Sequence, residues 1–198
     1  GGDALMSGDK SLKKILDAIY DMAKKKKEAN KDRPKGEKYA ELLRVRLGSR
    51  LPVYLPQRIT DELAAVLKDF KEKASAIGVE QFVIQTHFES PMEITPDARD
   101  GILKLISAGW MVTNQHVFTQ ASSRRGHTAK LRKDLNDIGV VNYYTFSVKG
   151  YMENQFNFAT NSRAVQEQIE EKSFGSISEK YYDKLKTFPQ DPEMMIEK

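Results

Sequence analysis

The sequence predicts an α/β fold in which helices flank an open, parallel sheet. Four short segments are apolar, or alternate apolar and charged residues, as strands do. Between them lie segments whose apolar residues recur at helical spacing. These have roughly the 10 to 15 residues typical of a crossover between parallel strands. We therefore expect βαβ units within a single domain.

The first half of the chain contains two of these helices and two strands. A helix follows Asp9, and residues 43–47 alternate like a half-buried strand. Thr60 is placed to cap a second helix, and residues 82–84 form a short, continuously apolar strand. The apolar positions of the two helices are Leu12, Ile15, Leu16, Ile19 and Met22, then Leu63, Val66, Leu67, Phe70 and Ala74.

The next helix and strand have the clearest boundaries. Thr95 stands at the N-cap, Pro96 lies in the first turn and Gly109 ends the helix. Residues 110–116 then begin with an apolar run and end in polar side chains. This segment predicts the third strand.

The last part of the chain adds one more helix–strand unit. A helix from Thr128 stops at Gly139, before a fourth strand at 140–146. Ser162 is placed to cap a further helix, with Val165 and Ile169 on its apolar face. We expect one more helix and a loose end after residue 178.

Composition is that of an ordinary globular protein. The 198 residues are 39% hydrophobic and 30% charged, and no apolar run approaches the roughly 18 residues of a membrane helix. There is no cysteine, which excludes disulfides, thiolate metal sites and a cysteine nucleophile from this chain. We expect a cytoplasmic protein with no membrane partner.

Residues 24–38 are rich in lysine and carry much of the net charge of +4. Asn30, Pro34 and Gly36 interrupt them and almost nothing in the segment is apolar, so we interpret it as a helix end running into a solvated loop. A nucleic-acid patch is the alternative. The lack of interleaved aromatic residues argues against nucleic acid as a partner.

Polar side chains follow each predicted strand. The carboxyl ends of parallel strands meet at one edge of a sheet, where ligands bind. Arg50 suits a carboxylate or phosphate, and His87 and Gln115 would lie beside it. The polar residues at these ends are Arg46, Ser49, Arg50, Thr86, His87, Glu89, Asn114, Gln115, His116, Ser147 and Lys149.

These residues also allow simpler readings. Arg50 could be a surface arginine paired with an acid, and His87 a structural hydrogen-bonder. A metal pair at His87 and Glu89 has no third ligand at suitable spacing. Phosphate-loop and dinucleotide-binding fingerprints are absent. The residues alone therefore predict a binding fold with a cleft that favours anions.

Several motifs resemble the lysine 2,3-aminomutase family of radical S-adenosylmethionine enzymes. The resemblance covers residues 1 to about 144. It implies an incomplete (β/α) TIM-like barrel with an open parallel sheet of about four to five strands. The matching motifs are residues 1–5 (GGDAL), 48–53 (GSRLPV), 55–60 (LPQRIT), 86–88 (THF), 93–95 (EIT) and 114–115 (NQ).

The resemblance implies S-adenosylmethionine, a [4Fe-4S] cluster and pyridoxal phosphate as cofactors. Gly1, Gly2 and Asp3 match the glycine-rich motif that holds the methionyl part of S-adenosylmethionine. The matches to family positions that line the same cleft are Arg50, His87 and Gln115, and the matches to an aromatic strand beside the cofactor are Tyr143, Tyr144 and Phe146.

The chain also departs from the family pattern. The family's cluster loop, CxxxCxxC, would precede the glycine motif, and its pyridoxal phosphate lysine lies in a later segment. Neither is in this sequence, which also begins without Met. We expect a fragment, inactive by itself, that lacks the first barrel strands. The resulting open sheet edge favours a homodimer.

Two further departures concern the substrate. Residues 118–127 form a longer and more basic loop than the family's. Lys149 stands where lysine-specific members place an aspartate, which would favour a substrate with a side-chain carboxylate such as glutamate. The alternative is that Lys149 points into solvent.

The leading interpretation is a fragment of an isomerase that moves an amino group on an amino acid. The alternative is a non-catalytic module of the same fold that binds an anion or a partner.

Overall fold

A computed structural model describes residues 2–147, 151–154 and 156–174. Its centre is a four-stranded sheet in the order β1-β2-β3-β4, and all three strand pairs are parallel. This confirms the predicted α/β class and is compatible with a partial TIM-like barrel. The strands are β1 (Arg44–Gly48), β2 (Gln81–Thr86), β3 (Met111–Val117) and β4 (Val141–Phe146).

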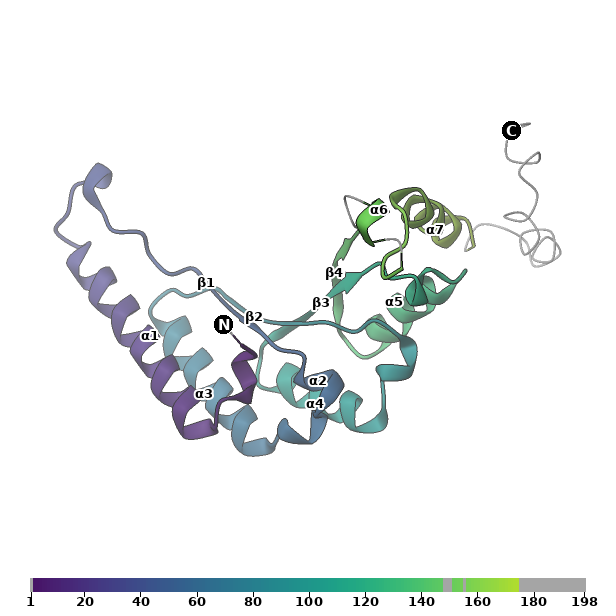
Figure 1. The fold of residues 1–198 in the computed structure, drawn as a ribbon. Coiled ribbons are helices and arrows are strands. Elements are labelled where there is room, and N and C mark those ends of the chain that lie inside the picture. Colours follow the sequence, from purple (N-terminus) through teal and green to yellow (C-terminus); the bar gives the residue numbers. More distant parts are fainter. Residues whose placement is uncertain (1, 148–150, 155, 175–198) are drawn as a thin grey trace, which may run out of the picture.

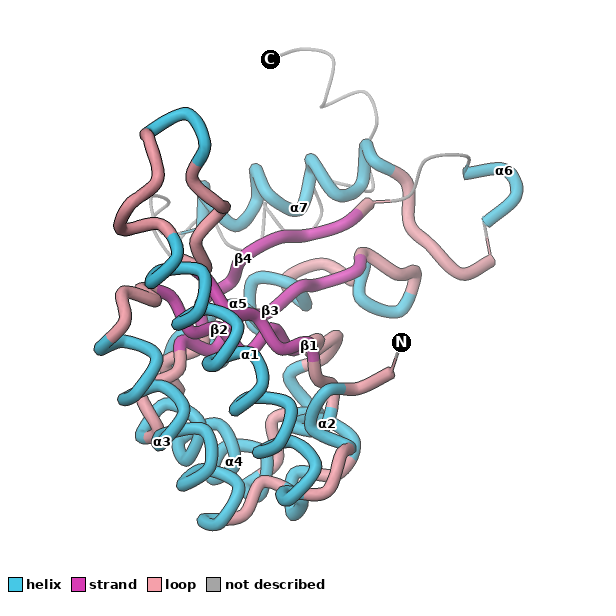
Figure 2. Tube along the Cα trace, turned by 90° about the vertical axis from the view of Figure 1, so that its left-hand side faces the viewer, coloured by secondary structure: helices cyan, strands magenta, loops and turns pink. Residues whose placement is uncertain are grey.

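Helices cover one face of this sheet and leave the other open over β1 to β3 (Figure 1). A second view shows α1, α3 and α4 together on one side of the strands (Figure 2). Near β4, α7 packs against α5. The helices are α1 (Asp9–Ala29), α2 (Leu51–Tyr54), α3 (Asp61–Ala76), α4 (Pro96–Ser107), α5 (His127–Asp137), α6 (Tyr151–Asn154) and α7 (Asn161–Phe174).

The core lies between the sheet and these helices. Ile84 on β2 and Leu105 on α4 are fully buried within it. Phe70, Phe82 and Trp110 form an aromatic group whose ring centroids lie 5.5 to 6.2 Å apart. The Trp110 indole Nε1 donates a hydrogen bond of 3.0 Å to the Leu67 carbonyl, so its one polar atom is satisfied inside the core.

The helix boundaries follow the predicted local chemistry. The hydroxyl of Thr60 accepts from Leu63 N, and that of Thr95 accepts from Ala98 N. Gly109 and Gly139 follow α4 and α5 with φ of 81° and 82°, a region that favours glycine. These caps confirm the predicted starts and stops.

The lysine-rich segment is a helix end that runs into a loop, as predicted, because Lys26 and Lys27 lie in the last turn of α1, which ends at Ala29. The predicted cap of the last described helix was wrong. The last described helix is capped by Thr160, whose Oγ1 accepts from Arg163 N, and Ser162 lies within the helix. Val165 and Ile169 are exposed there. The helix expected after residue 178 lies outside the described residues.

The strand ladder contains one irregularity. Asn114 pairs with Asn142, but the next pair is Gln115 with Tyr144, so Tyr143 is an extra residue on β4. This is the pattern of a β-bulge, which increases local twist. Among the described residues, no helix is long and apolar enough to cross a membrane.

Truncation of Ile84 tests the core. We expect Ile84→Ala to lower the free energy of unfolding by about 2 to 5 kcal/mol, because it removes buried apolar surface and leaves a cavity. Urea unfolding measures this loss. Leu103→Ala on the exposed side of α4 is the control and should change stability by about 0.5 kcal/mol or less. Equal losses in the two variants would contradict the described core.

Candidate functional site

A cavity of about 530 Å³ lies at the carboxyl ends of β1, β2 and β3. Five of the residues that the family resemblance assigned to a ligand line it together, namely Gly2, Asp3, Arg50, His87 and Gln115. The lining residues are Gly2, Asp3, Arg46, Gly48, Ser49, Arg50, Gln85, Thr86, His87 and Gln115. We call this space the main cavity. The predicted convergence of polar groups from three strand ends is therefore present.

Asp3 fastens the N-terminal segment to the end of β1. Its Oδ2 accepts a 2.6 Å hydrogen bond from the backbone N–H of Arg50, and its Oδ1 accepts one of 3.0 Å from Leu5 N. One carboxylate thus joins segments 47 residues apart in sequence. Gly2 precedes it with φ of 141°, and an added Cβ would meet no atom within 4 Å.

Arg50 is held on several sides. Its Nε donates to the His87 carbonyl at 3.1 Å, and its Nη2 lies 3.5 Å from Glu93 Oε1. The guanidinium carbon lies 4.3 Å from the centroid of the Tyr54 ring. Arg50 is therefore paired with an acid, as the simpler reading proposed, while its side chain also lines the main cavity. These contacts fix its orientation before any ligand arrives.

Glu93 also organises the turn after β2. Its Oε2 accepts from the backbone N–H groups of Glu89 and Ser90, at 2.6 and 3.2 Å, and closes a capping box with Ser90. Glu93 was missed as a site residue in the sequence. The Ser-x-x-Glu spacing at 90–93 was the available signal for its cap, although not for its contact with Arg50.

A second carboxylate in this turn, Glu89, lies between two histidines. His87 Nε2 contacts Glu89 Oε1, and His116 Nε2 lies 3.5 Å from Glu89 Oε2. Oε1 also accepts from Val117 N at 3.1 Å, and His127 Nε2 lies 3.1 Å from the Glu89 carbonyl. All three histidines of the chain therefore gather around one residue.

Burial lowers the pKa of His116 to about 4. The nearby Glu89 carboxylate opposes this shift, whereas the charge of Arg132 adds to it. His116 is therefore neutral at neutral pH. Neither ring nitrogen has a hydrogen-bond partner of good geometry among the described residues.

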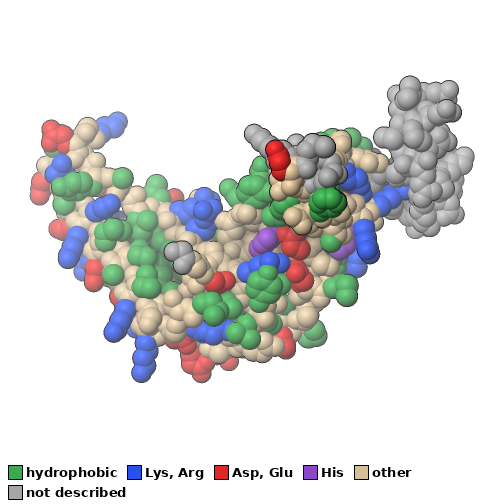
Figure 3. Space-filling view, viewed as in Figure 1, with side chains coloured by type: hydrophobic (Ala, Val, Ile, Leu, Met, Phe, Trp, Pro, Cys, Tyr) green, Lys and Arg blue, Asp and Glu red, His purple; other side chains and the backbone are tan. Residues whose placement is uncertain are grey.

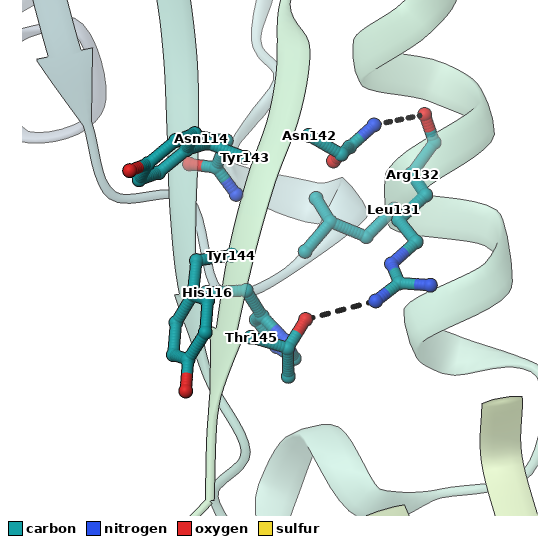
Figure 4. Close-up of a pocket in the computed structure, with 8 residues that line it drawn as sticks. All are labelled: Asn114, His116, Leu131, Arg132, Asn142, Tyr143, Tyr144 and Thr145. Atoms are coloured by element: carbon teal, nitrogen blue, oxygen red, sulfur yellow. Dashed lines mark hydrogen bonds between the residues drawn. The ribbon is translucent and has the colours of Figure 1, made fainter.

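His116 also faces a second, smaller cavity of about 220 Å³ between α5 and the strands β3 and β4 (Figure 4). Arg132 Nη2 donates to Thr145 Oγ1 at 2.9 Å, and Asn142 Nδ2 donates to the Arg132 carbonyl at 3.0 Å. Asn114, at the same cavity, accepts from Phe88 N and donates to Phe88 O, at 2.6 and 3.1 Å. Asn114 thereby holds the chain that follows β2.

Comparison with known proteins identifies the relatives of this chain. It is 35% identical over 171 residues to an uncharacterized KamA family protein of Methanocaldococcus jannaschii, covering 86% of this chain and 24% of that protein. It is 33% identical over 150 residues to a glutamate 2,3-aminomutase of Clostridioides difficile, with coverage of 75% and 29%. The chain is lysine 2,3-aminomutase-like.

A further relative is an L-lysine 2,3-aminomutase of Fusobacterium nucleatum, 34% identical over 117 residues, which are 59% of this chain and 21% of that protein. No family model matches. The lysine 2,3-aminomutase-like chain spans about a quarter of the length of these curated relatives. The resemblance predicted from the motifs is confirmed.

Of the remaining predicted site residues of this aminomutase-like chain, only Phe146 is described. Phe146 is on β4, 4.4 Å from Tyr144 between ring centroids, and does not line the main cavity. Gly1 and Lys149 lie outside the described residues. Gln85 was missed, and its Nε2 donates to Gln115 Oε1 at 2.5 Å within the main cavity. Its position on β2, next to the buried Ile84 and so on the open face of the sheet, was the signal that could have identified it.

The low pKa of His116 makes stability depend on pH. The unfolded chain takes up this proton near pH 6.5, whereas the folded protein does so only near pH 4. We therefore expect the free energy of unfolding to fall as pH drops from 6.5 to 4, by on the order of 3 kcal/mol from this group.

Denaturant unfolding across this pH range measures the effect. The His116→Asn variant serves as the reference, because the difference between the two proteins isolates this histidine from other titrating groups. NMR titration of the ring gives the pKa directly. A ring that titrates near 6.5 would contradict the described burial.

Proposed function

We propose that this chain is part of a radical S-adenosylmethionine aminomutase and that the main cavity binds S-adenosylmethionine. The observation that carries the proposal is the convergence of Gly2, Asp3, Arg50, His87 and Gln115 on one cavity. These residues belong to separate motifs that match the family. Relatives named lysine and glutamate 2,3-aminomutase support the same assignment.

The residues of the main cavity fit S-adenosylmethionine. Its volume lies within the range of roughly 300 to 1,000 Å³ that small-molecule sites have. Thr86 Oγ1 is buried at this cavity without a hydrogen-bond partner among the described residues. The backbone at Gly2 has open space beside it. Polar atoms and exposed backbone therefore remain for a polar ligand.

In this proposal each residue has a positioning task. Asp3 would hold the glycine segment against the end of β1, so that backbone N–H groups face the ligand. Arg50, fixed by Glu93, would present its remaining donors to a carboxylate. His87, oriented by Glu89, would bind through its other ring nitrogen, Nδ1. When bound, S-adenosylmethionine supplies the radical chemistry of the reaction.

We propose that the [4Fe-4S] cluster and pyridoxal phosphate are held by residues outside this chain. The chain has no cysteine to offer a cluster, and its described residues include no group of three or more His, Asp or Glu side chains able to hold a metal ion. On this proposal the chain forms one domain and is inactive alone. The residues described here would bind and orient the ligand.

The proposed substrate is an amino acid, and we propose that its side chain is acidic. The basic residue Lys149 is the sequence observation that favours this choice, by resemblance to family positions that contact the substrate. Attraction between unlike charges would then select glutamate over lysine.

A ligand-binding measurement tests the proposed cofactor site. We expect the intact protein to bind S-adenosylmethionine, and His87→Ala or Gln115→Ala to weaken binding about tenfold, the effect of one lost hydrogen bond. Equilibrium dialysis with labelled S-adenosylmethionine measures the affinity. Arg99→Gln on the outer side of α4 is the control for loss of a surface group.

Absence of binding, or unchanged affinity in both site variants, would contradict the proposal. Turnover separates the enzyme from the alternative of a non-catalytic binding module. The enzyme would convert an α-amino acid into its β-isomer, whereas the module would bind its ligand and convert nothing.

The free edge of the sheet leads to a separate expectation. Among the described strands, β1 and β4 each have a neighbour on one side only, and the resemblance places the family's first barrel strands next to β1. We propose that this edge pairs with a second copy, because unpaired strand edges tend to add another strand. Sedimentation of the isolated chain would then give a dimer, and a monomer at all concentrations would refute this.

A further inference from the structure

Two arginines on β1 project from the open face of the sheet. Val45 between them is buried against the helices, whereas Arg44 and Arg46 are exposed. Side chains alternate along a strand, so both arginines lie on the face that no helix covers. This face is hollowed, with basic and apolar side chains gathered along it (Figure 3).

Neither arginine is neutralised by the rest of the described chain. The side chains of Arg44 and Arg46 make no ion pair or hydrogen bond to another described residue. By contrast, Arg50, Arg58 and Arg163 each contact a carboxylate. Two like charges on one face of one strand repel each other. An anion bound between the two guanidinium groups would reduce this repulsion.

Arg46 connects this pair to the main cavity. It lines the main cavity together with Arg50 and His87. It also lines an adjoining cavity of about 80 Å³, together with Arg44 and Tyr143. A ligand that extends from the main cavity along the open face would therefore meet Arg46 first and Arg44 next.

The surroundings indicate what kind of anion this is. A guanidinium offers a planar fork of donors that matches a carboxylate. Met111, Val141 and Tyr143 lie beside the arginines and are about half exposed, which provides an apolar surface for a short methylene chain. A cationic side chain such as that of lysine would be repelled here.

We propose that Arg46, with Arg44 next to it, binds the side-chain carboxylate of an acidic amino acid substrate. This inference rests on the proposed function, since it places the substrate next to the main cavity. It uses none of the residues outside the described part of the chain. It assigns a recognition role to residues of β1 that precede Gly48. The sequence motifs gave these residues no role.

The test measures binding of L-glutamate, L-lysine and inorganic phosphate to the intact holoenzyme by isothermal titration calorimetry. Arg46→Gln and Arg44→Gln should each weaken L-glutamate binding by about 10-fold or more, as expected for a lost charged hydrogen bond. Neither should weaken L-lysine binding. Arg46→Lys, which keeps the charge but loses the fork, should fall between the native protein and Arg46→Gln.

Arg99→Gln is the matched control, because it removes the same charge from the exposed side of α4. Unchanged L-glutamate affinity in both β1 variants would overturn the proposal. The proposal would also be overturned if these variants lost phosphate binding but kept L-glutamate binding, because the arginines would then bind a phosphate group. Circular dichroism confirms that each variant is folded, and Arg44→Gln provides a test independent of Arg46.

Binding of S-adenosylmethionine to the native protein separates this inference from the proposed function. If S-adenosylmethionine fails to bind, the proposed function fails. If it binds, and the arginine variants still bind L-glutamate normally, only the carboxylate site is refuted.

Discussion

Burial of one face of the sheet under helices is the constraint that decides which strand residues face the open side. Val45, Ile84 and Val112 point into the core, so their neighbours along each strand must point the other way. A slip of one residue would exchange the two faces. Arg46 and Gln85 therefore face the open side because their neighbours are buried.

The turn after β2 depends on carboxylates that each have two tasks. Glu93 closes the turn through backbone N–H groups and also pairs with Arg50. Glu89 accepts from β3 at Val117 N and contacts His87 and His116. Because each acid joins separate segments, the orientations of Arg50 and His87 are coupled through a single short stretch of chain.

Local chemistry made much of the fold predictable from sequence. Thr95 marks the start of a helix and Gly109 marks its end. Both act through contacts within a few residues, so these signals depend little on the rest of the fold. The convergence on the main cavity followed from the parallel order of the strands. The pairing of Arg50 with Glu93 could not be predicted in this way. Glu93 is 43 residues away, and side-chain pairing at that separation depends on the folded geometry.

The end of the first helix was also predictable from local chemistry, because Asn30, Pro34 and Gly36 follow the lysines and α1 ends at Ala29. The cluster around Glu89 was not predictable in this way. The gathering of three histidines around Glu89 combines residues from the turn after β2, from β3 and from the start of α5. No spacing in the sequence announces such a cluster, because it depends on how α5 packs against the sheet.

The bulge between β3 and β4 divides the last strand into two parts. Before Tyr143 the residues of β4 follow one pairing register, and from Tyr144 onward they follow another. Tyr144 and Phe146 therefore pair with β3 in a register that is shifted by one residue from the register of Val141. One extra residue reverses the alternation of side chains along the strand, so Tyr144 and Phe146 face a direction that an unbroken ladder from Val141 would not give them.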